Sequence, residues 1–300
     1  MQNTSQLLMI RPVNFGYNAE TAVNNTFQVK TNNDSTQEKA LKEFDAFANL
    51  LTKNGISVTV IEDTTEPFTP DSIFPNNWVS FHENGTIILY PMFADNRRKE
   101  RKQHVLDVIN KKFEVKNIID FSDYEKENLF LEGTGSMVLD RDNKIVYACI
   151  SPRTNEKVLN DFCAKNNYTA VTFTSIADNV PVYHTNVMMC VADKYVVICL
   201  NSIVNKEERK KLIDNVEQTS KEIIPITIEQ MNSFAGNMLQ VINNKGEKLL
   251  VMSSQAHHSL SDKQIADLTK YNCILHSSLT TIETAGGGSA RCMLAEIFLL

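Results

Sequence analysis

The chain has 300 residues, of which 42% are hydrophobic and 22% charged, and its formal net charge is −6. These values are typical of a folded globular protein and exclude a disordered or fibrous chain. Lys and Arg form no long run, which disfavours a nucleic-acid partner, and no apolar stretch approaches the length that crosses a membrane. The six cysteines show no CxxC pair and no Cys/His spacing suited to zinc. We therefore predict a reduced, cytoplasmic protein.

A unit of hairpin, helix and strand recurs along the sequence. A strand pattern at 7–10 comes first, followed by a helical pattern at 36–54 and a strand pattern at 58–61. The later units have expected hairpins at 78–91, 135–150, 186–200 and 237–252, expected helices at 97–111, 154–165, 206–220 and from 261 onward, and expected strands at 117–121, 169–174, 222–226 and 273–277. Helix starts lie about 55 residues apart, which indicates five copies of one unit.

Such a repeat predicts a closed ring. Four hairpins are continuous in sequence, so the fifth has to combine the apolar run after Cys292 with the strand before Arg11. Pairing of the two ends is what closure requires, because closure removes the exposed edges of the sheets. No linker rich in Pro, Gly or Ser interrupts the pattern. We predict one α/β domain over residues 1–300.

Three consecutive glycines, Gly286 to Gly288, stand just before Arg291 and Cys292. Glycine can adopt positive φ and can let backbone N–H groups approach a ligand closely. An average free cysteine is a buried structural residue. A neighbouring cation and a glycine loop are, however, the surroundings that a nucleophilic cysteine needs. We interpret Cys292 as a nucleophile.

Polar residues stand at matching points of the repeat, at or before the first strand of each hairpin. These points are Asn76-Asn77, Glu132-Gly133, His184 to Asn186, 234–236 and 288–292. In a ring, equivalent loops converge on the axis. The repeat therefore predicts that Cys292, His184 and Glu132 meet. Each taken alone also suits a structural role, His184 as a satisfied core histidine and Glu132 as a capping carboxylate.

At this point the sequence resembles a known superfamily. The segments 131–136 (LEGTGS), 184–186 (HTN) and 286–293 (GGGSARCM) are similar to motifs of the amidinotransferase or guanidino-group-modifying superfamily, the penteins. The similarity covers essentially the whole chain and is greatest to the arginine-deiminase-related citrulline hydrolase branch. It implies a five-bladed α/β propeller. It also implies Cys292 as nucleophile and His184 as general acid and base, with Glu132 orienting the imidazole.

The resemblance also implies residues for the amino-acid end of a substrate. Arg97 and Arg153 match the arginines that bind the substrate carboxylate in dimethylarginine hydrolases, and Asp71 matches a residue for the α-ammonium group. Arg97 and Arg153 each begin a helical pattern, where a structural arginine is equally common. No motif for a phosphate, dinucleotide or metal is present, so we expect no cofactor. We expect a small amino-acid substrate, and the sequence is compatible with a homodimer.

Three amides depart from the relatives and indicate the substrate. Asn76 and Asn77 stand where dimethylarginine hydrolases have two acids that bind a guanidinium, and Asn186 stands where deiminases have an acid. An amide is neutral and has both a donor and an acceptor, as does a ureido group. We therefore favour citrulline, cleaved to ornithine, ammonia and carbon dioxide. A guanidino hydrolase or deiminase, an amidinotransferase and a non-catalytic pentein remain alternatives, and the amides can also be simple loop caps.

A neutral substrate leaves activation of the thiol to the protein. We expect a thiolate–imidazolium pair between Cys292 and His184, supported by Arg291, and backbone donors from the loop at Gly288. The neighbouring pair His257-His258 has no partner pattern for a metal, and we expect it in a loop.

Overall fold

The computed structural model describes residues 1–30, 35–177 and 179–300. In this part of the chain, helices alternate with strands, and the strands form five three-stranded sheets and one short two-stranded hairpin. The fold is mixed α/β, as predicted. No helix among these residues is long and apolar enough to span a bilayer.

All five three-stranded sheets have the same topology. The middle strand pairs antiparallel with one neighbour and parallel with the other. In this order the sheets are β17 (Ala295–Glu296), β1 (Gln6–Arg11) and β2 (Ser57–Glu62); β3 (Val79–Phe81), β4 (Thr86–Leu89) and β5 (Asn117–Asp120); β6 (Val138–Asp140), β7 (Ile145–Cys149) and β8 (Thr169–Phe173); β11 (Met189–Val191), β12 (Tyr195–Ile198) and β13 (Glu222–Pro225); β14 (Leu239–Ile242), β15 (Lys248–Ser253) and β16 (Cys273–Ser277). The small hairpin is β9 (Ile176–Ala177) with β10 (Val180–Pro181).

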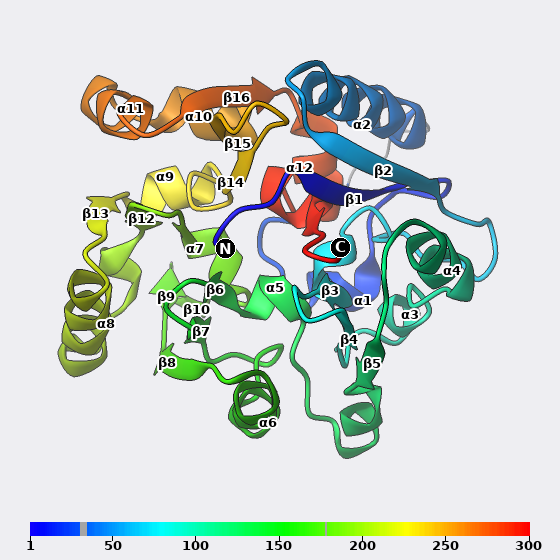
Figure 1. Cartoon of the computed structure of the whole chain (residues 1–300), viewed down its shortest axis with the longest axis horizontal. Helices are drawn as coiled ribbons and strands as arrows, with labels where there is room; N and C mark the ends of the chain where they lie inside the picture. The colour runs from blue at the N-terminus through cyan, green and yellow to red at the C-terminus, as the bar shows by residue number, and fades with distance from the viewer. Residues whose placement is uncertain (31–34, 178) are drawn as a thin grey trace.

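A long helix connects the middle strand of each sheet to its parallel neighbour. These helices lie at the periphery of the molecule and are α2 (Thr36–Lys53), α4 (Gln103–Lys112), α6 (Glu156–Asn166), α8 (Lys206–Gln218) and α11 (Asp262–Thr269) (Figure 1). Helix α2 buries Ala40, Phe44, Phe47 and Leu51, whose spacing places them on one face. Helix α11 begins at a capping box between Ser261 and Gln264.

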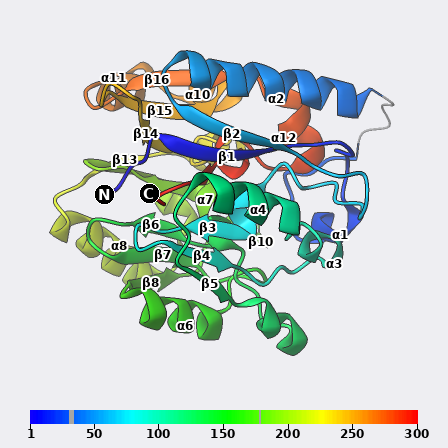
Figure 2. The same cartoon turned by 45° about the vertical axis from the view of Figure 1, so that its right-hand side comes forward.

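The antiparallel partners of the middle strands, which we call the inner strands, contact strands of neighbouring sheets near the centre of the molecule. Strands β6, β11 and β14 lie next to one another, and β17 lies next to β3. Figure 1 shows both ends of the chain near this centre, and Figure 2 shows them side by side at one side of the molecule. Leu7 pairs with Glu296 and Leu8 with Ala295, so the two ends share a sheet in the way that closure of the ring requires.

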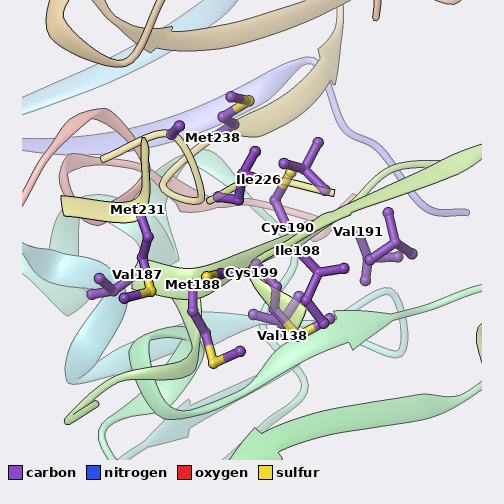
Figure 3. Close-up of a cluster of buried hydrophobic side chains, with 14 of the residues drawn as sticks. Val138, Val187, Met188, Cys190, Val191, Ile198, Cys199, Ile226, Met231 and Met238 are labelled. Atoms are coloured by element: carbon purple, nitrogen blue, oxygen red, sulfur yellow. The ribbon is translucent and has the colours of Figure 1, made fainter. Parts of the chain in front are cut away.

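Buried apolar side chains fill the space between the sheets. The largest cluster surrounds β11 and β12 and includes Met188, Cys190, Ile198 and Met231 (Figure 3). Cys163 and Cys190 are both buried in such clusters, as structural cysteines usually are.

Two local predictions were wrong. The expected helix at 97–111 is divided into α3 (Asp95–Arg98) and α4, with the backbone extended at Lys102. The division coincides with buried ion pairs, Arg97 with Glu100 and Lys102 with Asp63, so tertiary contacts override the local periodicity. The expected loop at His257-His258 is the helix α10 (Ser254–Ser259), which Ser253 caps by accepting from the Ala256 N–H.

The remaining helices are short. They are α1 (Ala19–Ala22), η1 (Pro75–Asn77), η2 (Ser122–Glu127), α5 (Gly133–Ser136), α7 (Thr185–Met188), η3 (Leu200–Ser202), α9 (Ile228–Asn232), α12 (Thr280–Gly286) and η4 (Ala290–Met293), where η marks a 3-10 helix.

Candidate active site

Short turns that lead into the inner strands carry the site. The turns η1, α5, α7 and η4 precede β3, β6, β11 and β17, and an irregular turn at 234–237 precedes β14. The polar residues that they supply are Asn77, Glu132, His184, Asn237 and Cys292. Each of the five sheets therefore contributes a residue from the same point of the repeat.

Glu132 and His184 form a buried pair. The Nε2 atom of His184 lies 2.7 Å from Oε2 of Glu132, and both residues are buried. The same oxygen accepts from Nη1 of Arg153 at 3.4 Å, and the other oxygen accepts from the backbone N–H of Phe93 at 2.9 Å. Because a carboxylate only accepts, the proton lies on Nε2 and leaves Nδ1 as a base. The predicted role of Glu132 as the orienting carboxylate fits these contacts.

The charges of the pair differ from our expectation. Burial lowers the pKa of His184 to about 4, although Glu132 opposes this shift. Burial would raise the pKa of Glu132, but the Arg153 guanidinium and the His184 hydrogen bond hold it below its ordinary value. At neutral pH the imidazole is therefore neutral and the carboxylate ionised. A thiolate–imidazolium pair in the unliganded chain is not supported, because the site is too buried to favour the charged imidazole.

Two amides donate to the sulfur of Cys292. Nδ2 of Asn186 lies 3.4 Å and Nδ2 of Asn237 3.3 Å from Sγ. Asn237 is held in place because its Oδ1 accepts from the Arg291 N–H at 3.0 Å. Two N–H groups aimed at one sulfur can stabilise the negative charge that it carries when it attacks a substrate, since hydrogen bonds to an ionised acceptor are stronger than neutral ones. We did not predict Asn237, although it occupies the same point of the fourth hairpin as Asn186 does in the third.

Arg291 does not line the cavity of Cys292. Its guanidinium donates to the Leu294 carbonyl at 2.7 Å and to Glu296 at 3.0 Å. It lines a separate small cavity, together with Asn186 and Cys190, rather than the cavity of Cys292. We expected the Arg291 guanidinium to stabilise the Cys292 sulfur. Arg291 instead acts through its backbone N–H, which binds the Asn237 side chain that donates to the sulfur.

Asn77 has a fixed orientation, and Arg97 fixes it. Nη1 of Arg97 donates to Oδ1 of Asn77 at 2.8 Å, while the rest of the guanidinium donates to both oxygens of Glu100 and to the Phe74 carbonyl. Because guanidinium has no acceptor, Asn77 must present its oxygen to Arg97 and its Nδ2 elsewhere. That Nδ2 is buried and has no partner among the described residues. Asn76 instead donates to Thr134 at 3.2 Å and does not line the cavity.

Asp71 and Arg153 connect the site to the segment 18–25. Oδ2 of Asp71 accepts from Asn18 at 2.8 Å and from Thr21 at 3.1 Å, while its Oδ1 is buried and unpartnered among the described residues. Burial raises the pKa of Asp71. Arg153 donates to the Thr21 carbonyl and to Asn24 at 2.8 Å each. Two buried charged side chains of the site are thus hydrogen-bonded to this segment.

The three glycines differ in backbone conformation and in their neighbours. Gly286 ends helix α12, and of the three only Gly287 has positive φ, at +64°. Gly288 lines the cavity, and a Cβ there would lie 2.8 Å from the Phe74 ring and 3.3 Å from Cβ of Cys292. Close packing against the nucleophile therefore requires glycine at 288.

One narrow cavity joins these groups. Most of the predicted residues line it, namely Cys292, His184, Asp71, Asn77, Arg97, Arg153 and Gly288; Thr21, Asn25, Phe74 and Tyr183 also line it and were not predicted. Its volume is ≈ 10 Å³, about the space of one water molecule. An amino acid is larger than this space, so its binding requires some of the lining residues to move apart.

Replacing Asn186 with alanine tests the activation of the thiol. Oδ1 of Asn186 has no partner among the described residues, so the change removes only the bond to Cys292. We expect alkylation of Cys292 by iodoacetamide at pH 7 to slow about tenfold, as loss of one hydrogen bond to a charged group implies. Peptide mass spectrometry can follow Cys292 and the exposed Cys273 in the same sample, so that Cys273 serves as the reference. Equal rates in both proteins would exclude this role for Asn186.

Comparison with family models tests the resemblance. The model described as N,N-dimethylarginine dimethylhydrolase, eukaryotic, matches residues 11–299. The chain belongs to this family. Membership in the pentein superfamily is thus confirmed, and so is the predicted enzyme class, a hydrolase of C–N bonds other than peptide bonds. Citrulline hydrolysis within that class stays a prediction.

Solved structures show the same fold. ArgZ, described as an arginine dihydrolase from the ornithine–ammonia cycle in cyanobacteria, is 16% identical with a TM-score of 0.76; the match covers 97% of this chain and 40% of ArgZ. The N-terminal domain of ArgZ bound to substrate is 16% identical with a TM-score of 0.77, over 98% of this chain and 99% of the domain. A dimethylarginine dimethylaminohydrolase adduct with S-methyl-L-thiocitrulline is 14% identical with a TM-score of 0.66, over 98% and 100%. No curated protein sequence matches the chain.

Proposed function

We propose that this dimethylarginine dimethylhydrolase family member hydrolyses the ureido group of citrulline to ornithine, ammonia and carbon dioxide through a covalent adduct on Cys292. The observation that carries the proposal is the unpaired Nδ2 of Asn77 in the wall of the cavity. A ureido oxygen can accept from this N–H group. A guanidinium has only donors and would leave it unsatisfied, at a cost of about 1–3 kcal/mol.

A second unpaired atom of the site complements the N–H groups of the substrate. Oδ1 of Asp71, a residue of the cavity wall, is a buried acceptor without a partner among the described residues. The wall of the cavity thus holds one unpaired donor and one unpaired acceptor, and a ureido group presents both an acceptor and donors. Arg97 donates to Glu100 and Asn77, and Arg153 donates to Glu132, Thr21 and Asn24, so both arginines stay candidates for the substrate carboxylate.

The first half-reaction uses His184 as base and then as acid. Nδ1 takes the thiol proton of Cys292, and the thiolate attacks the ureido carbon while Asn77 donates to its oxygen. The tetrahedral adduct collapses as the imidazolium gives its proton to the departing amino group, which leaves as ammonia. Glu132, already hydrogen-bonded to Nε2, stabilises the transient imidazolium. The product is a thiocarbamate in which Cys292 carries the carbonyl and the ornithine nitrogen.

The second half-reaction restores the enzyme. His184 deprotonates a water that attacks the thiocarbamate carbon, and the C–S bond breaks with return of the proton to the sulfur. The carbamic acid that is released loses carbon dioxide and gives ornithine. We include in the proposal that residues 1–300 act as one catalytic domain, with the five sheets as blades of a propeller that β1 and β17 close.

The deciding experiment is to identify products from citrulline, arginine and dimethylarginine in separate reactions, with Cys292→Ser as the inactive control. Ornithine from citrulline supports the proposal. Citrulline from arginine or dimethylarginine, with no turnover of citrulline, would replace it with guanidino hydrolysis. Transfer to an added amine would indicate an amidinotransferase, and no turnover of any substrate would indicate a binding protein.

Replacing Asn77 with aspartate should shift the substrate preference. Arg97 would hold one carboxylate oxygen and the other would take the place of the N–H donor, which favours a guanidinium over a ureido group. We expect the ratio of kcat/KM for arginine to that for citrulline to rise at least about tenfold. Asn76→Asp is the matched control, because it adds the same charge one residue away and outside the cavity. An equal shift in both variants would contradict the proposed contact.

A further inference from the structure

A second and larger cavity lies on the other side of Tyr183. Its volume is ≈ 370 Å³, which is in the range of small-molecule sites, about 300–1,000 Å³. Among the residues that the structure describes, Tyr183 alone lines both this cavity and that of Cys292. The walls combine apolar and polar side chains and come from 26–29, the hairpin β9–β10, helix α9, helix α10 and helix α12. The mechanism above uses no part of it.

The acidic residue Glu283 indicates which class of ligand this cavity can bind. It is the only charged side chain among the described residues of the lining, and it is 2% exposed. Oε1 accepts from the Ser289 hydroxyl at 2.6 Å, which holds the carboxyl group in place. Oε2 is buried and has no partner among the described residues. Burial raises the pKa of Glu283, the nearby Ser253 and Ser289 side chains oppose this shift, and no described basic residue forms an ion pair with the carboxyl group.

A buried carboxylate oxygen without a partner is costly unless a ligand satisfies it. A cationic N–H group supplies both a donor and the missing charge. The apolar side chains Phe27, Met231 and Phe234 fit a hydrocarbon chain attached to that group. A second carboxylate, as an amino acid carries, would meet Glu283 without a described cation to neutralise it. The ligand class therefore differs from the substrate of the Cys292 cavity.

We propose that this cavity binds a small organic cation, an alkyl amine or alkyl guanidine, with its charged head on Glu283 and its hydrocarbon chain between Phe27 and Met231.

Calorimetric titration of the full chain with n-hexylamine tests the proposal, with n-hexanol as the uncharged counterpart. We expect saturable binding of one n-hexylamine per chain and at least tenfold weaker binding of n-hexanol. Glu283→Gln should weaken n-hexylamine binding at least tenfold because it removes the charge. Val180→Trp, at a rim residue that is 37% exposed, should weaken it similarly by filling the cavity.

The control is Asp71→Asn, which removes the buried acid of the Cys292 cavity and should leave the affinity for n-hexylamine within twofold. If Glu283→Gln does not fold, Val180→Trp decides. The proposal is overturned by the absence of saturable binding, by unchanged affinity in Val180→Trp, or by a loss of affinity in Asp71→Asn. None of these results depends on whether citrulline is the substrate.

Discussion

Glu132→Gln should lower kcat by about 10³–10⁴-fold, the scale expected when the carboxylate that orients a catalytic histidine becomes an amide. Three donors converge on Glu132, from His184, Arg153 and the Phe93 N–H. Glutamine has only one oxygen, so its NH₂ group must face at least one of these donors. If it faces His184, the imidazole has to move its proton to Nδ1. That nitrogen can then no longer accept the proton of Cys292.

The measurement is steady-state kcat, together with the rate of Cys292 alkylation and the thermal unfolding midpoint. Glu127→Gln is the matched control, since Glu127 is exposed and pairs only with the exposed Lys157 among the interactions of the described residues. We expect alkylation to slow in Glu132→Gln and to stay unchanged in Glu127→Gln. A loss of kcat smaller than tenfold in a folded Glu132→Gln protein would exclude the orienting role.

Gly135→Ala should reduce kcat/KM by about 100-fold through a single methyl group. A Cβ at 135 would lie 2.3 Å from Nδ2 of Asn77 and 2.9 Å from Nδ1 and Cε1 of His184. Neither side chain can yield cheaply, because Arg97 holds Asn77 and Glu132 holds His184. Both the donor to the substrate and the base would be displaced, and a shift of about 1 Å in such groups costs about 100-fold.

Gly16→Ala is the control for this variant, because a Cβ at 16 meets nothing within 4 Å. It makes the same chemical change without touching the site. We expect Gly135→Ala to keep the circular dichroism spectrum of the parent chain and to lose activity, whereas Gly16→Ala keeps both. Full activity in Gly135→Ala would mean that the positions of Asn77 and His184 are not critical.

The repeat was readable from the sequence because its apolar spacing is decided locally. Helix α2 and the hairpin β14–β15 lie where the pattern predicts, since each buries one face against a neighbouring element. The same reading failed at 97–111, where buried ion pairs formed with distant residues decide the backbone path. Local periodicity contains no information about such partners.

The site was predictable to the extent that the repeat positions it. Cys292, His184 and Asn77 line one cavity because equivalent turns meet at the centre. Asn237 could have been found by applying the same rule to the fourth hairpin. The neutral state of His184 could not have been predicted in this way. It follows from how deeply the imidazole is buried, which depends on the packing of the whole site.

The pairing of β1 with β17 has a consequence for how activity is lost. This pairing anchors β17 and therefore the preceding turn η4, which carries Cys292. The turns that face η4 belong to the other four sheets. Loosening the pairing would separate the sulfur from the imidazole while leaving each helix and hairpin intact. For the proposed reaction, we therefore expect partial unfolding at this one junction to abolish turnover even when the rest of the chain stays folded.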